Sequence, residues 1–165
     1  MATPTNLPAS QTVGQNATST WANDIRGAFR ILQVVSATSS TAWTNNTSTY
    51  TDITGVTVDI TPQATSSKIF VVVSLAGAFK STNNTSLDVE IRRASTTIYT
   101  ALSNFNTATT ATNAGTIVLT YLDSPATTSA RTYKVRGRSS ANLAAVGSQA
   151  LGTSDSTITV FEISA

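Results

Sequence analysis

The feature that most constrains the fold is an alternation of apolar and polar residues that recurs along the chain. Apolar side chains occupy every second position in the segments 56–60, 87–91 and 133–135. This period of two is typical of a β-strand, whose successive side chains point to opposite faces of a sheet. Similar strand-like runs cover 29–36, 53–60, 68–78, 87–92, 96–102, 115–122, 131–138 and 157–163. About eight short strands joined by polar loops predict an antiparallel sandwich or a jelly roll.

The composition supports an all-β fold. Only 11% of the residues are charged, whereas Thr, Ser and Asn together account for 64 of the 165 residues. Helix surfaces are usually rich in Glu, Lys and Ala, and Thr is favoured on pleated strands. We therefore predict a jelly-roll-like antiparallel β-sandwich head at residues 29–165, with an immunoglobulin-like sandwich as the alternative. The alternating segments predict a core that contains Val56, Val58, Ile60, Leu87, Val89, Ile91, Tyr133 and Val135.

Residues 1–28 have a different character and predict an extended arm. They carry Pro4, Pro8 and many small polar residues. We expect the arm to attach the head to a larger assembly through a short helical turn, on which residues four apart share one side. Large aromatic side chains often anchor such contacts. The alternative is a disordered terminus whose Trp folds back on its own sandwich. The predicted attachment residues are Trp21, Asp24, Ile25 and Arg26.

The composition also removes whole classes of chemistry. The chain has no His and no Cys, which excludes a Ser-His-Asp triad, a thiolate nucleophile and a conventional zinc site. It contains no phosphate-binding glycine motif and no EF-hand pattern. Asp88 and Glu90 come nearest to the carboxylate pair of a glycosidase, but Arg92 follows on the same strand face and favours a charge-compensated polar surface. We therefore predict no catalytic, cofactor-binding or metal-ligating residues and no cofactor.

The basic residues suggest a surface that contacts an anionic partner. Lys134, Arg136 and Arg138 alternate with apolar or small residues, so they share one outward face, and Arg131 lies just upstream. Such a row can contact an anionic partner, such as an acidic surface glycan or an acidic protein patch. The alternative is an ordinary exposed face kept soluble by its charge. A net charge of +2 is too small to predict nucleic-acid binding.

The longest apolar run, 69–79, is too short to predict insertion into a membrane. It is apolar on both strand faces, which favours a central strand or a subunit contact within a homo-oligomer.

Four segments carry a resemblance to a known group of proteins. They are 27–35 (GAFRILQVV), 56–62 (VTVDITP) with 66–69 (SSKI), 121–125 (YLDSP) with 133–135 (YKV), and 156–163 (STITVFEI). In this order the chain resembles structural proteins of tailed bacteriophages, especially small fibre or appendage domains of marine and cyanobacterial phages. Between the two halves lies the low-complexity stretch 103–114 (SNFNTATTATNA), which we expect to be a long surface loop.

The resemblance implies a non-enzymatic virion component with a β-sandwich head, commonly a homotrimer, made in the host bacterial cytoplasm. It also implies that the N-terminal arm attaches the head to capsid, neck or tail proteins. We therefore predict a fibre- or spike-type appendage that can contact a glycan of the host surface. The alternatives are a trimeric capsid decoration (cement) protein and, third, a glycan depolymerase.

Overall fold

The computed structural model describes residues 30–164 except for 82–84, 107–112 and 148–153, so the predicted arm at 1–28 lies outside the described residues. All regular structure in the described part of the chain is β. Each of the eight predicted strands is present, and two strands of three residues each, β2 and β9, were not predicted. The strands are β1 (Ile31–Ser39), β2 (Trp43–Asn45), β3 (Thr51–Ile60), β4 (Lys68–Lys80), β5 (Ser86–Arg93), β6 (Thr96–Asn106), β7 (Asn113–Asp123), β8 (Arg131–Ser139), β9 (Ala144–Val146) and β10 (Ser156–Ile163).

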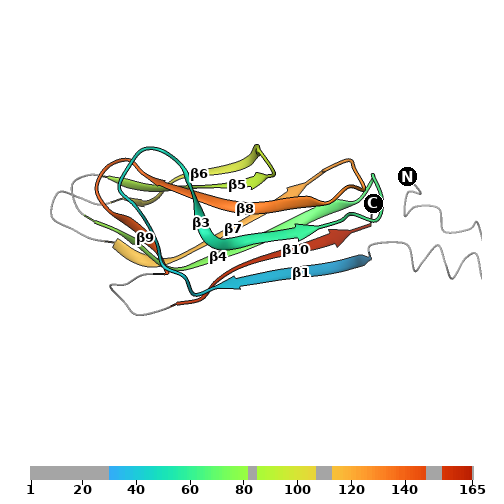
Figure 1. Ribbon diagram of the computed structural model, residues 1–165, viewed down its shortest axis with the longest axis horizontal. Coiled ribbons are helices and arrows are strands. Elements are labelled where there is room, and N and C mark those ends of the chain that lie inside the picture. The colour runs from blue at the N-terminus through green and yellow to red at the C-terminus, as the bar shows by residue number, and fades with distance from the viewer. Residues whose placement is uncertain (1–29, 82–84, 107–112, 148–153, 165) are drawn as a thin grey trace, which may run out of the picture.

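The eight long strands form two antiparallel sheets that pack face to face (Figure 1). The first sheet has the order β1-β10-β4-β7, and the short strands β9 and β2 extend it beside the far end of β4. The second sheet has the order β3-β8-β5-β6. The chain crosses repeatedly between the sheets, and the first strand pairs with the last, as in a jelly roll. An immunoglobulin-like sandwich would instead place its first two strands side by side. The predicted jelly-roll-like antiparallel sandwich is therefore confirmed.

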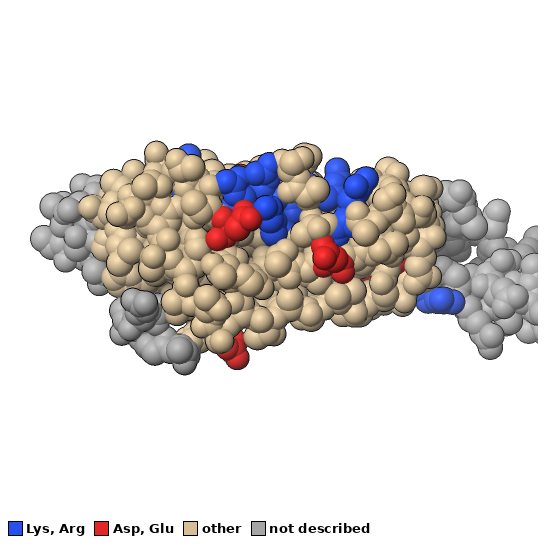
Figure 2. Space-filling model, viewed as in Figure 1, with Lys and Arg blue, Asp and Glu red and all other residues tan. Residues whose placement is uncertain are grey.

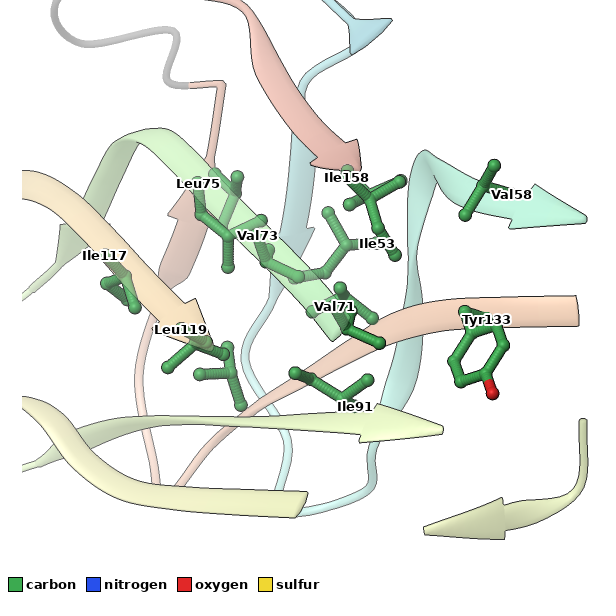
Figure 3. Packing of buried hydrophobic residues seen from close by; sticks show 14 of the residues in the cluster. Ile53, Val58, Val71, Val73, Leu75, Ile91, Ile117, Leu119, Tyr133 and Ile158 are labelled. Atoms are coloured by element: carbon green, nitrogen blue, oxygen red, sulfur yellow. The ribbon is translucent and has the colours of Figure 1, made fainter. Parts of the chain in front are cut away.

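The core lies between the two sheets and is built by the alternating positions (Figure 3). From the first sheet, β4 contributes Val71, Val73 and Leu75, all without exposed surface. From the second sheet, β5 and β8 contribute Ile91 and Tyr133. All eight residues predicted for the core are buried. Each such side chain stabilises the fold by about 1.5–3 kcal/mol relative to its exposed state.

A buried polar tie joins the two sheets at one end of the sandwich. The Tyr133 hydroxyl donates to Asp123 Oδ2 at 2.6 Å, and Arg93 Nη1 donates to both carboxylate oxygens of Asp123 at 2.8 Å. Asp123 ends β7 of the first sheet, whereas Tyr133 and Arg93 belong to the second sheet. Burial, together with the bond to Asp123, raises the pKa of Tyr133 above its ordinary value of 10.0.

A second buried carboxylate, that of Glu162 in β10, holds the connection between β3 and β4. Its oxygens accept hydrogen bonds from Gln33 Nε2 at 2.6 Å and from the backbone N–H of Gln63 at 2.7 Å. Burial by itself raises the pKa of Glu162, but the hydrogen bonds to the carboxylate outweigh it and lower the pKa below 4.5. The interior therefore includes charged groups whose partners are fixed by the fold.

The prediction of a surface loop over 103–114 was wrong at both ends of that range. β6 continues to Asn106 and β7 begins at Asn113, so only 107–112, outside the described residues, separate the two strands. The physical reason is pairing: Leu87 of β5 lies opposite Phe105, and Lys80 of β4 lies opposite Asn113. Thr- and Asn-rich sequence tolerates strand geometry where a neighbouring strand supplies the ladder hydrogen bonds.

Candidate functional site

The basic row of β8 lies on the outer face of the second sheet. Tyr133 and Val135 point into the core, so the alternating Lys134, Arg136 and Arg138 point outward. β8 is flanked by β3 on one side and β5 on the other. Figure 2 shows basic side chains gathered over this sheet, with acidic side chains beside them.

Each of the three outward basic residues is engaged with a carboxylate on a neighbouring strand. Lys134 Nζ lies 2.7 Å from Asp52 Oδ2, and Arg136 Nε lies 3.3 Å from Asp52 Oδ1. Arg136 also reaches across to Glu90, with Nη1 at 3.2 Å from Oε1. Arg138 Nε donates to Asp88 Oδ2 at 3.0 Å. The register explains the pairs made by the two arginines, because Arg136 lies opposite both Asp52 and Glu90, and Arg138 lies opposite Asp88.

Arg131, the fourth predicted contact residue, is not part of this row. It lies opposite Ile60 at the start of β8, an odd number of positions from Lys134. Alternation therefore directs its Cβ to the other side of the sheet. The structure brings three of the four predicted residues together and leaves Arg131 apart.

The acidic partners on β5 are buried rather than solvated. The side chains of Asp88 and Glu90 are 6% and 7% exposed, beneath the arginines that pair with them. Thr97 Oγ1 also donates to Glu90 Oε2 at 3.1 Å. The charge compensation expected for this face is present, but the carboxylates that provide it are buried beneath the arginines and are not solvated. Two carboxylates engaged in this way favour a structural role over general acid–base catalysis.

Tyr50 belongs to this site and was missed in the sequence. The Arg138 guanidinium lies 4.7 Å from the centre of the Tyr50 ring, and Arg136 donates to the Tyr50 backbone carbonyl. Burial raises the pKa of Tyr50, and the charge of Arg138 opposes that shift. Tyr50 precedes β3 in a loop, and no local pattern relates it to a strand 86 residues away.

We call these residues the charged cluster: Tyr50, Asp52, Asp88, Glu90, Arg92, Lys134, Arg136 and Arg138. Four basic groups face three acidic groups, which leaves a formal charge of +1. The ion pairs run across β3, β8 and β5, so the cluster fastens three strands together. Its small net charge is poorly suited to binding a polyanion by charge alone.

Other kinds of site lack support in the described ranges. Those residues contain no group of three or more His, Cys, Asp or Glu side chains placed to hold a metal ion. Nor does the described part of the chain include a helix long and apolar enough to cross a membrane.

Fold and site together define a jelly-roll β-sandwich that carries a cluster of paired charges on the outer face of one sheet. No protein-family model matches the chain, and no curated protein matches it either. Two of the solved structures that are similar to this chain share 15% identity with it. One is the infectious bursal disease virus VP2 subviral particle, with a TM-score of 0.42 over 81% of this chain and 38% of that chain. The other is a mutant VP2 of the same virus in derived T=1 particles, with a TM-score of 0.37 over 79% and 36%. The chain thus spans less than two-fifths of either neighbour.

Proposed function

We propose that this chain is a non-enzymatic structural protein of a tailed-bacteriophage virion. In this proposal it is a fibre- or spike-type appendage that residues 1–28 attach to the particle. The observation that carries the proposal is that the segments of the phage resemblance are the framework strands of one jelly roll. Of segment 27–35, residues 31–35 lie in β1, which pairs with β10, the strand that segment 156–163 forms. Segments 56–62 with 66–69 join β3 to β4, and 121–125 with 133–135 belong to β7 and β8.

The contacts that the acidic side chains make within the sandwich support a structural role. Asp52, Asp88 and Glu90 hold cations of the charged cluster, and Asp123 and Glu162 tie strands and loops together in the interior. Five of the eight acidic residues therefore stabilise the sandwich. Function has to be argued from such sites and not from the fold, because one fold hosts many activities.

The place where the described part of the chain begins supports attachment of the head to the particle by one end of the sandwich. The backbone N–H of Ser164 donates to the Arg30 carbonyl at 2.9 Å, and the Arg30 N–H donates to Ser164 Oγ at 3.0 Å. The arm therefore joins the sandwich where β1 begins and β10 ends, and β4 and β8 end at the opposite pole (Figure 1). An arm bound to the particle would direct that opposite pole outward, towards the host.

The test is incorporation into particles. Deletion of residues 1–26 is expected to leave the head folded, with an unchanged melting temperature, but absent from purified virions. Trp21→Ala is expected to weaken incorporation without changing the melting temperature, because an interface Trp is often worth more than about 2 kcal/mol. Trp43→Phe is the matched control, since it alters a buried Trp of the sandwich and leaves the arm intact. Full occupancy by the truncated protein would refute attachment by the arm.

The copy number per virion separates the proposal from its nearest alternative. A capsid decoration protein must cover a lattice and is present in hundreds of copies, whereas an appendage is present in far fewer. Quantitative mass spectrometry of purified particles measures this number directly. A glycan depolymerase would need an open pair of carboxylates, and Asp88 and Glu90 are instead buried in ion pairs.

A further inference from the structure

The outer face of the first sheet differs in character from the charged cluster on the second. Residues paired in register point to the same side, so β1, β10, β4 and β7 build cross-strand rows on this face. We call the face formed by the following four rows the neutral face. The rows are Ile31, Ile163 and Lys68, completed by Ser124, which follows β7 and accepts a hydrogen bond from Lys68; Val34, Phe161, Phe70 and Leu122; Ser36, Thr159, Val72 and Thr120; and Thr38, Thr157, Ser74 and Val118.

The second of these rows is apolar across all four strands. Val34 and Leu122 at its two ends are each 53% exposed, and the rings of Phe70 and Phe161 between them lie with centroids 6.2 Å apart. Val118, two rows away on β7, is 63% exposed. None of these side chains contributes to the core, which lies on the other side of the sheet. The row is therefore a continuous apolar ridge across the outer face of the first sheet.

Charge is nearly absent from this face. Among its sixteen positions Lys68 alone is charged, and it lies in the row at the rim, where Nζ donates to Ser124 Oγ at 2.7 Å. The remaining polar side chains are Ser and Thr hydroxyls, such as Ser36 and Thr159, which are 2.8 Å apart. A charged partner would lose hydration here without gaining an ion pair. The surface that complements this face must itself be neutral.

The area of the neutral face reaches the threshold for a specific contact. Strands lie about 4.8 Å apart, and residues two positions along a strand lie about 6.8 Å apart. Sixteen positions on this grid project about 500 Å² per copy, and two such faces bury about 1,000 Å² in total, which is the lower bound for a specific interface.

We propose that the neutral face is the self-association surface, where it packs against the neutral faces of other copies around a symmetry axis. The same face of a second copy meets both requirements: it lacks charge, and its hydroxyls donate and accept equally well. The outer face of the second sheet does not, because contact with it would bury the charged cluster. Strand 69–79, predicted to lie at a subunit contact, supplies Phe70, Val72 and Ser74 to this surface.

The inference deepens the proposed appendage, and one part of it rests on that function. A rotation axis parallel to the strands would bring the arms of all copies to one pole, as attachment to a particle requires. A homotrimer is the assembly that the phage resemblance implies. The chemistry of the neutral face does not depend on the virion role.

The test measures the oligomeric state of the full-length chain by sedimentation velocity at micromolar concentration. The wild-type chain is expected to be an oligomer, and Leu122→Lys is expected to be a monomer that keeps the β-sheet circular dichroism spectrum of a folded sandwich, because the lysine would be buried unpaired in the contact. Leu102→Lys is the matched control: Leu102 is 62% exposed on β6 of the second sheet, and its substitution should leave the oligomer intact. Val118→Lys is a second disrupting variant, should Leu122→Lys fold poorly.

Thiol labelling gives an independent readout, because the chain contains no Cys. A Leu122→Cys variant is expected to react slowly with a polymer-linked maleimide in the oligomer, whereas Leu102→Cys should react at the rate of an exposed thiol. A monomeric wild-type chain would overturn the inference, and so would an oligomer that persists in folded Leu122→Lys and Val118→Lys variants. Loss of the oligomer only on deletion of residues 1–29 would overturn it too, by assigning the contact to the arm. Incorporation into virions is a separate measurement, so the two proposals can fail independently.

Discussion

Gly137 interrupts the alternation of β8 because the indole of Trp43 fills the space that a side chain would need. A Cβ at position 137 would lie 2.6 Å from Trp43 Cη2, 3.0 Å from Cζ2 and 3.2 Å from Cζ3. Trp43 is buried, and its Nε1–H donates to Thr51 Oγ1 at 3.1 Å, so the ring is held in place. We therefore predict that Gly137→Ala destabilises the sandwich by overpacking.

Two opposing effects set the magnitude. Forcing one extra carbon into a packed site costs about 1–3 kcal/mol. Replacing Gly by Ala also restricts the unfolded chain, which stabilises by about 0.4–1 kcal/mol. The net loss in the free energy of unfolding is then at most about 2.6 kcal/mol, with a midpoint of about 1.3 kcal/mol, or a fall in melting temperature of up to about 10 °C for a chain of this size.

The decisive measurement is the same substitution in a Trp43→Phe background, followed by urea denaturation. Phenylalanine lacks the distal ring atoms that the new Cβ would meet, so Gly137→Ala is expected to be neutral or stabilising there. The sign of the effect should thus change between the two backgrounds, which is a coupling between neighbours. An equal destabilisation in both would refute the steric account of Gly137.

Two further predictions concern pH. The pKa of Glu162 is lowered in the folded state, so the stability that its carboxylate provides is complete above pH 4.5 and is lost as the pH falls through the folded-state pKa. Glu162→Gln should therefore lower the free energy of unfolding by about 1–3 kcal/mol at pH 7. In chemical denaturation at a series of pH values, the same substitution should reduce the loss of stability at acid pH. The pKa of Tyr133 is raised, so above pH 10.0 the unfolded chain ionises first and stability falls; in Tyr133→Phe this alkaline slope should decrease by up to about 1.4 kcal/mol per pH unit, and an unchanged slope would contradict the assignment.

The strands and the core could be predicted from the sequence because alternation is a local signal. Residues such as Val56, Val58 and Ile60 identify both a strand and its buried face, without knowledge of its neighbours. The order of the strands is not local, since it depends on which of many possible pairings buries the most surface. β2 and β9 could not be predicted, because three residues such as those of β9 (Ala144–Val146) are too few to show a period.

The candidate site was predictable only in part for the same reason. Alternation placed Lys134, Arg136 and Arg138 together, but whether they are available to a partner depends on strands far away in the sequence. Asp52 is separated from Lys134 by 82 residues, and only the pairing of β3 with β8 brings its carboxylate beside the basic row. A row of cations in a sequence is thus evidence for a shared face and not for an available charge.

The distribution of the few charges between the two sheets is the feature that links stability to assembly. The basic side chains of the charged cluster keep one broad face in contact with water, and their ion pairs with Asp52, Asp88 and Glu90 cross strand boundaries and fix the pairing of β3, β8 and β5. The neutral face has no such requirement for water, and its apolar ridge from Val34 to Leu122 gains free energy when it is covered. If both outer faces carried charges, covering either face would cost hydration, and neither face would be preferred for contact with another copy. Segregation of charge onto one face therefore gives the head a direction in which to associate, and the proposed exposure of the charged cluster follows from the same arrangement.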